Sequence, residues 1–282
     1  MRVYLLYRLG LWLNALLPWA LGVRVAAWGG AWHRRVCPAD RAIVRSNLSV
    51  LLSEGIAEND PRIREVFRHF GWYLLEFFRG HRDDLHASIS GYHHLLSAVR
   101  PRRGCIVLTG HVGNWELGAI LLARAGWPIS VVALSHTNPR VNGLFDDQRR
   151  RCGVGVIPFG PHAAAGCLRA LQQGGVVGLA ADRDYGTDGL PVQLAGHRWI
   201  VPRGPAVLSL RTGAPVLPTF FTRSSSGGFA LSIEAPIWPP AGPWTDGEVM
   251  TLTQRYAQAI EGAVRRFPTQ WLMFKPLGSV TP

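Results

Sequence analysis

Lysine is almost absent from this sequence, and acidic residues are scarce. Of the 30 basic residues only Lys275 is a lysine, and 18 Asp and Glu leave a formal net charge of +12. Charged residues make up 17% of the 282 residues, whereas 48% are hydrophobic. Such a basic chain favours anionic partners: lipid surfaces, phosphorylated substrates or an acidic carrier protein. No basic-aromatic motif or zinc-finger spacing is present, which argues against a nucleic-acid partner.

Cysteine is also scarce, and no two cysteines form a CxxC motif. The four are Cys37, Cys105, Cys152 and Cys167. Their spacing predicts free thiols in a reducing compartment rather than a disulfide framework. No GxSxG elbow of a serine hydrolase is present. The histidines of "HRDDLH" (81–86) and "YHH" (92–94) lack a recognised metal-ligand spacing, so neither a metal nor an organic cofactor is expected.

No apolar run has the length of an ordinary membrane-spanning helix. Residues 9–23 are uncharged, but this run is shorter than the roughly 20 residues that a span requires, and Pro18 interrupts it. The first 36 residues contain five arginines, four tryptophans and no acidic residue. We therefore expect residues 1–36 to be seated in the membrane, monotopic or barely spanning, with cytoplasmic basic flanks, and residues 37–282 to form the main domain. A cleaved signal peptide and a buried core helix are the alternatives.

The residue pattern changes near residue 104. Before this point, two stretches with apolar residues at helical spacing begin at Asp40 and Asp60, both good N-caps. After it, strand-like apolar runs alternate with helical stretches. The strand-like runs are "CIVLTG", "ISVVALS", "VGVIPFG", "GVVGLAAD", "APVLPTFFTR" and "FALSIEAPI", with "RSSSGG" (223–228) as a predicted hairpin turn. This alternation predicts an α/β domain whose sheet is covered by helices on both faces.

The segment "LTGHVGNWELGAI" (108–120) places an ionisable pair where an apolar strand ends. Gly110 permits a sharp exit from the strand, and His111 then falls at the edge where open α/β sheets bind ligands. Glu116, one turn into the following helix, is placed to reach back to the His111 ring. A carboxylate on one imidazole nitrogen fixes the tautomer and leaves the other nitrogen as a base. The alternative is a histidine that caps the turn and hydrogen-bonds within the core.

"HVGNWELG" resembles the HxxxxD/E signature of glycerolipid-type acyltransferases, in the form found in the late acyltransferases of lipid A synthesis and the related mycobacterial phosphatidylinositol-mannoside acyltransferases. Four more blocks resemble that family in the same order: "NPRVNGLFDDQRRRCG" (138–153), "ADRDYGTDGLPVQLAG" (181–196), "VPRGPAVLSLRTGAPVLP" (201–218) and "FPTQW" (267–271). The lipid A enzymes commonly continue with an aromatic-His-Arg-Arg stretch, where this chain has "WLMFKPLG". This departure leaves the acceptor open.

The resemblance implies a glycerol-3-phosphate-acyltransferase-like fold, with a mostly parallel central sheet flanked by helices and an N-terminal membrane-seated helix. It also implies a bacterial inner-membrane enzyme with its catalytic domain on the cytoplasmic face. Such an enzyme transfers a fatty acyl chain from acyl carrier protein or coenzyme A to a hydroxyl of a membrane glycolipid. A lipid A-type precursor is the expected acceptor, and phosphatidylinositol mannoside or another membrane lipid is the alternative.

The same resemblance assigns His111 as the general base and Glu116 as its partner. The substrate-binding candidates are Asn114, Arg149, Arg151, Asp182 and Asp184. An arginine there would hold a phosphate or the oxyanion, although three consecutive arginines leave the register open. The two aspartates would orient His111, the arginine or an acceptor sugar. A thioesterase, with water as the nucleophile, and a catalytically silent lipid-binding or scaffold protein are the competing interpretations.

Overall fold

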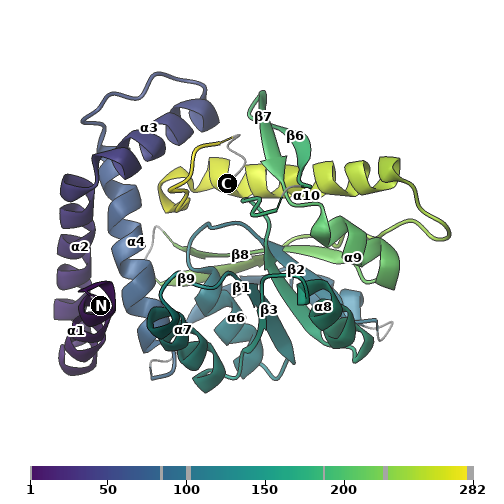
Figure 1. The fold of residues 1–282 in the computed structure, drawn as a ribbon, viewed down its shortest axis with the longest axis horizontal. Helices are drawn as coiled ribbons and strands as arrows, with labels where there is room; N and C mark the ends of the chain where they lie inside the picture. The colour runs from purple at the N-terminus through teal and green to yellow at the C-terminus, as the bar shows by residue number, and fades with distance from the viewer. Residues whose placement is uncertain (1, 83–84, 100–102, 187, 225–227, 278–282) are drawn as a thin grey trace.

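A mostly parallel sheet with helices on both faces forms the centre of the molecule (Figure 1). The computed structural model describes residues 2–82, 85–99, 103–186, 188–224 and 228–277. Seven strands pair in the order β1-β9-β8-β2-β5-β3-β4. Every pair is parallel except β8 with β9, which is antiparallel. The predicted mostly parallel sheet flanked by helices is therefore confirmed.

The strands of this sheet are β1 (Ala87–Ser90), β2 (Cys105–Thr109), β3 (Ile129–Ala133), β4 (Gly155–Pro158), β5 (Val176–Ala180), β8 (Val216–Arg223) and β9 (Phe229–Ile233), and a separate hairpin consists of β6 (Leu190–Leu194) and β7 (His197–Val201). The helices are α1 (Arg2–Leu16), α2 (Trp19–Val36), α3 (Pro38–Leu52), α4 (Pro61–Arg79), α5 (Tyr92–Val99), α6 (Trp115–Arg124), α7 (Pro139–Arg151), α8 (Ala163–Gln172), α9 (Gly204–Thr212) and α10 (Asp246–Arg266), followed by the 3-10 turn η1 (Pro268–Gln270).

All six strand-like runs and the helical stretches between them form the predicted elements. The segment 223–228 joins the antiparallel pair β8 and β9, as predicted, although residues 225–227 lie outside the described residues. Sequence patterns missed β1, α5 and the β6–β7 hairpin. The hairpin strands begin "LPV" and "HRW", so polar residues and a proline obscure their alternation.

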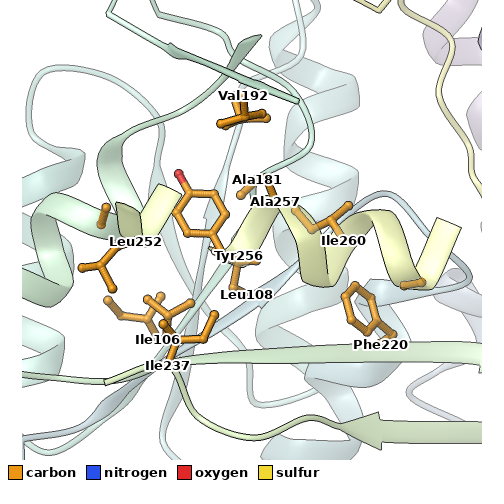
Figure 2. Packing of buried hydrophobic residues seen from close by; sticks show 14 of the residues in the cluster. Ile106, Leu108, Ala181, Val192, Phe220, Ile237, Leu252, Tyr256, Ala257 and Ile260 are labelled. Carbon is orange, nitrogen blue, oxygen red and sulfur yellow. The ribbon is translucent and has the colours of Figure 1, made fainter. Parts of the chain in front are cut away.

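The central strands are buried on both faces, which explains why their sequences are continuous apolar runs rather than alternating ones. On one face, Ile106, Leu108 and Phe220 pack under α10 and the β6–β7 hairpin, where Tyr256 and Ile260 fill the space (Figure 2). On the opposite face, the intervening strand residues pack against α5, α6 and α7. Alternate residues of a strand therefore belong to different layers of the core.

Helices α1 to α4 stand together at one side of the sheet (Figure 1). Pro18 separates α1 from α2, so the uncharged N-terminal run forms parts of two helices instead of one long helix. α2 packs closely on α4 because Gly30 and Gly71 have no side chains: a Cβ on either glycine would lie about 2 Å from a backbone oxygen of the other helix.

The structure tests the two predicted helix starts in the N-terminal part of the chain, at Asp40 and Asp60. Asp60 caps α4 as predicted and accepts the backbone N–H of Arg62 at 2.8 Å. Asp40 is not an N-cap, because α3 begins at Pro38, with Cys37 as the N-cap, and Asp40 therefore lies inside the first turn.

Within the described residues, no helix has both the length and the hydropathy needed to cross a bilayer. The N-terminal membrane helix therefore stays a prediction.

Candidate active site

His111 lies two residues beyond the carboxyl end of β2, and a buried carboxylate holds it at two points. Asp182 Oδ1 is 2.5 Å from His111 Nδ1, and Asp182 Oδ2 accepts the backbone N–H of His111 at 2.7 Å. Trp271 Nε1 donates to the same Oδ2 at 3.0 Å. Asp182 follows β5, the strand paired with β2, so two adjacent carboxyl ends bring the pair together.

The surroundings of this pair set its protonation. Burial of Asp182 opposes ionisation, but interactions with His111 and the charge of Arg183 outweigh burial and lower the Asp182 pKa to about 2. Burial, followed by the charge of Arg183, lowers the pKa of His111 below its ordinary value. At neutral pH the carboxylate is therefore ionised and the imidazole is neutral. Because an ionised carboxylate only accepts hydrogen bonds, Nδ1 carries the proton and Nε2 keeps its lone pair.

Glu116 does not pair with the His111 ring, which corrects the expected contact. It forms a two-point ion pair with Arg149, with Nε–Oε2 at 3.0 Å and Nη2–Oε1 at 2.5 Å. Asp146 accepts from Arg149 Nη1 at 3.0 Å. The reason is geometric: Glu116 lies in the first turn of α6 and is directed at α7, whereas the ring nitrogen of His111 is directed at the end of β5. The carboxylate of Glu116 raises the pKa of Arg149 although burial opposes this.

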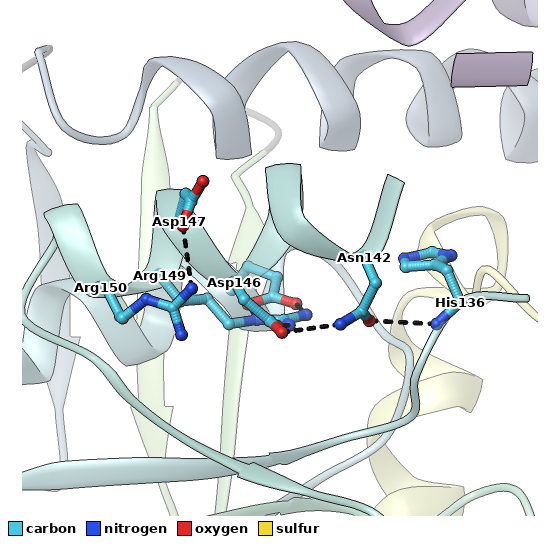
Figure 3. Close-up of polar contacts among 7 residues, drawn as sticks. His136, Asn142, Asp146, Asp147, Arg149 and Arg150 are labelled. Atoms are coloured by element: carbon cyan, nitrogen blue, oxygen red, sulfur yellow. Dashed lines mark hydrogen bonds and ion pairs between the residues drawn. The ribbon is translucent and has the colours of Figure 1, made fainter. Parts of the chain in front are cut away.

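The structure resolves which of the three consecutive arginines enters the site. Arg149 is buried and lines the central cavity, whereas Arg150 pairs with Asp147 at the surface and Arg151 is exposed at the end of α7. Figure 3 shows Arg150 with its partner Asp147, and Arg149 beside Asp146. Arg151 does not line this cavity, and its role in substrate binding stays a prediction.

The two remaining substrate-binding candidates lie in different environments. Asn114 is buried outside the cavity lining, caps α6 by accepting from Leu117 N at 3.2 Å, and donates to Glu76 at 2.9 Å. These hydrogen bonds shape the loop that carries His111, and the role of Asn114 in substrate binding stays a prediction. Asp184 does line the cavity, and its side chain accepts the backbone N–H of Gly186 at 3.2 Å.

Sequence reasoning missed two residues of the site, Trp271 and Arg183. The block "FPTQW" carried the signal for Trp271, but its contact with Asp182 depends on the 3-10 turn η1, which follows α10 directly. Two backbone hydrogen bonds join the loop that carries His111 to this turn: Gly113 N–H donates to Gln270 O at 2.9 Å, and Leu272 N–H donates to His111 O at 2.8 Å. Arg183, beside Asp182, donates to Leu272 O and lines the cavity.

A cavity of about 730 Å³ opens from His111, Glu116 and Arg149 into the apolar interior. One part lies between the sheet and α6. Strand register places Val107, Gly178 and Val131 in one row across β2, β5 and β3, and all three line the cavity. On the helix side, Gly118 and Ala119 contribute little side-chain volume. This part of the cavity is therefore bounded by small and aliphatic residues, and His111, Glu116 and Arg149 belong to the lining of the same cavity.

Comparisons with known proteins identify the family of this chain. The bacterial lipid A biosynthesis acyltransferase family matches residues 1–277. A phosphatidylinositol mannoside acyltransferase of Mycobacterium tuberculosis is 30% identical over 246 residues, covering 83% of this chain and 75% of the relative. A lipid A biosynthesis palmitoleoyltransferase of Escherichia coli is 27% identical over 278 residues, covering 93% and 86%.

The chain belongs to the bacterial lipid A biosynthesis acyltransferase family and is a lipid acyltransferase. Among solved structures, the 1-acyl-sn-glycerophosphate acyltransferase of Thermotoga maritima matches with a TM-score of 0.39 and 14% identity, covering 88% of this chain and 97% of that one.

Proposed function

We propose that this protein transfers a fatty acyl group from an acyl thioester to a hydroxyl of a membrane glycolipid. The observation that carries this proposal is the Asp182–His111 pair, whose histidine lines the cavity. A neutral imidazole with one nitrogen held by a carboxylate is suited to take a proton from an alcohol. The adjoining apolar space is suited to a hydrocarbon chain.

The reaction needs no acyl-enzyme. His111 Nε2 takes the proton of the acceptor hydroxyl as its oxygen attacks the thioester carbonyl, and the ionised Asp182 stabilises the resulting imidazolium. A C–O bond forms, and the carbonyl oxygen carries the negative charge of the tetrahedral intermediate. Arg183, which lines the cavity, is the candidate to stabilise this oxyanion. The intermediate then expels the thiolate, which recovers the proton from His111.

The Glu116–Arg149 pair has a positioning role in this proposal. Side-chain exposures of 6% and 10% leave the pair nearly shielded from water, and its partners come from α6 and α7. The pair therefore fixes two helices that line the cavity. It also keeps the guanidinium charge balanced, so that Arg149 interacts with a phosphate or sugar only through its remaining hydrogen-bonding capacity.

We propose that the acyl chain enters the space between the sheet and α6. Gly178 has no side chain to fill the row between Val107 and Val131, and a Cβ there would lie 3.0 Å from Val131 Cγ1. Successive rows of a sheet are about 6.7 Å apart on one face. The depth available to the acyl chain thus depends on which row of the sheet carries side chains large enough to fill the cavity.

We also propose that the N-terminal helices hold the protein at the inner membrane, with the catalytic domain on the cytoplasmic side. The residues with large exposed apolar side chains on α1 and α2 include Leu5, Leu9, Trp12, Leu16, Trp28 and Trp32, and Trp28 is 70% exposed. Apolar and tryptophan side chains combined with arginines are typical of helices that lie in the membrane interface. The proposed donors, acyl carrier protein and coenzyme A, are both anionic and complement the basic chain.

Mass spectrometry of host membrane lipids tests the proposal. Cells carrying wild-type protein are compared with cells carrying His111→Ala, after fractionation shows equal amounts of both proteins with the membranes. A glycolipid heavier by one acyl group, present only with the wild type, supports transfer and identifies the acceptor as a lipid A-type precursor or as a phosphatidylinositol mannoside. Released fatty acid without a heavier lipid would indicate a thioesterase, and unchanged lipids together with no turnover of purified acyl thioesters would indicate a silent lipid-binding protein.

A further inference from the structure

Three side chains of types that can bind a metal lie close together where α2 meets α3, far along the chain from the catalytic motifs. His33 lies in the last turn of α2, Cys37 joins the two helices, and Asp40 lies in the first turn of α3. One ligand atom from each lies within 4.8 Å of the other two, and His33 Nε2 is 2.8 Å from Asp40 Oδ2. Within the described residues, no other three His, Cys, Asp or Glu side chains meet in this way.

We propose that His33, Cys37 and Asp40 bind a zinc ion. An imidazole nitrogen, a thiolate and a carboxylate are all ligands that zinc takes, at about 2.0–2.3 Å. Binding releases the thiol proton, and the thiolate and carboxylate together then balance the two positive charges of the ion. Ligand atoms around one zinc lie somewhat closer than 4.8 Å, so side-chain rotation of Cys37 toward the His33–Asp40 pair completes the triangle.

The surroundings of the cluster suit a structural metal. The His33 ring packs against Phe67, Phe70 and Phe274, with ring centroids 5.0, 5.5 and 5.7 Å away. This aromatic wall fixes the orientation of the imidazole and excludes water from one side of the cluster. His33 and Asp40 keep 25% and 33% of their side chains exposed, which leaves an entry path and room for a water as the fourth ligand.

A metal at this junction would fix α3 relative to α2. Asn47 of α3 donates to Met273 O at 3.0 Å and to Lys275 O at 2.8 Å, and this C-terminal segment borders the catalytic cavity. The zinc ion would therefore act on stability rather than on the chemical step. Sequence spacing did not indicate the site, because His33, Cys37 and Asp40 are brought together by the bend between two helices.

Cobalt substitution tests this proposal independently of activity. Tag-free protein treated with a chelator is titrated with Co²⁺, and thiolate-to-cobalt absorption and stoichiometry are measured, followed by displacement with Zn²⁺. We expect one equivalent of cobalt with a thiolate band, and a higher melting temperature with Zn²⁺. Cys37→Ser should remove the band. His33→Gln and Asp40→Asn should weaken binding by at least the roughly 10–100-fold that loss of an outer partner costs.

Two variants serve as matched controls. Cys152→Ser removes another partly exposed thiol, and a His93→Gln/His94→Gln double variant removes two adjacent imidazoles whose ring centroids are 4.0 Å apart. Both should retain the wild-type cobalt spectrum. Absence of binding, a cobalt spectrum without a thiolate band, or wild-type binding by Cys37→Ser would overturn the proposal. Because each variant is first melted without metal, misfolding is recognised separately.

Discussion

Asp182 and His111 are joined twice, once through the imidazole Nδ1 at 2.5 Å and once through the backbone N–H at 2.7 Å. One contact sets the tautomer of the ring, and the other fixes the loop that carries it. Trp271 supplies a third hydrogen bond to the same carboxylate. The orientation of the proposed base therefore depends on a residue 71 positions away in the chain rather than on its neighbour in the HxxxxE motif.

Asp182→Asn removes the charge while keeping the shape of the side chain. We expect turnover to fall by about 10²–10⁴-fold, because the amide neither stabilises the imidazolium nor secures the Nδ1–H tautomer. The KM for the thioester should change little. Steady-state kinetics checks this, with Asp188→Asn as a control at an exposed carboxylate nearby. Equal turnover by the wild type and Asp182→Asn would show that the dyad is not used.

The pH profile should report the lowered pKa of His111. Burial and the charge of Arg183 disfavour the imidazolium, so kcat/KM should fall with decreasing pH only below the ordinary histidine pKa of about 6.5. Asp182→Asn removes an interaction that favours the imidazolium. The midpoint of the acidic limb of its residual activity should therefore lie at a still lower pH than in the wild type. A midpoint above 6.5 in the wild type would contradict this arrangement.

The Glu116–Arg149 pair should show strong coupling in unfolding experiments. Arg149→Met alone leaves Glu116 as an uncompensated buried charge and should lower the free energy of unfolding by about 3–5 kcal/mol, whereas Glu116→Ala should cost less because Asp146 still pairs with Arg149. The double variant should lose less than the sum of the two. The exposed Asp147–Arg150 pair is the matched control, since surface ion pairs contribute about 0–1 kcal/mol. Additive losses at Glu116 and Arg149 would refute the coupling.

Gly178→Ala tests the path proposed for the acyl chain. The added methyl group meets Val131 and narrows the cavity one row beyond Thr109, so we expect a preference for shorter acyl thioesters. A second substitution, Val131→Ala, should restore much of the space and recover the longer chains. Competition among donors of different chain length provides the measurement. If the wild type, Gly178→Ala and the double variant all prefer the same acyl-chain length, the acyl chain does not lie between the sheet and α6.

The sequence predicts the elements of the fold better than the contacts within the site. Apolar runs and Gly or Pro boundaries located β2 to β5, β8 and β9, since burial of both sheet faces leaves a direct trace in composition. The same patterns placed His111 at a strand end. They could not pair it with Asp182, because that contact follows from the lateral order of β2 and β5, which local periodicity does not encode.

The arginine run shows the same division. Sequence similarity narrowed the candidates to Arg149 and Arg151, and only the rotation of α7 determines that Arg149 enters the core while Arg151 meets solvent. Trp271 was visible in a family-like block, but its role depends on the turn that returns the chain from α10 to His111. Such relationships are set by tertiary packing, which the local sequence pattern does not encode.

The most direct test of the central claim uses purified protein, an acyl thioester and the acceptor glycolipid. Thiol release and acylated product are measured for the wild type, His111→Ala and His136→Ala, the last of which alters a second histidine lining the same cavity. We expect equimolar thiol and acylated glycolipid from the wild type and from His136→Ala, and neither product from folded His111→Ala. Wild-type product formation by His111→Ala would contradict this claim.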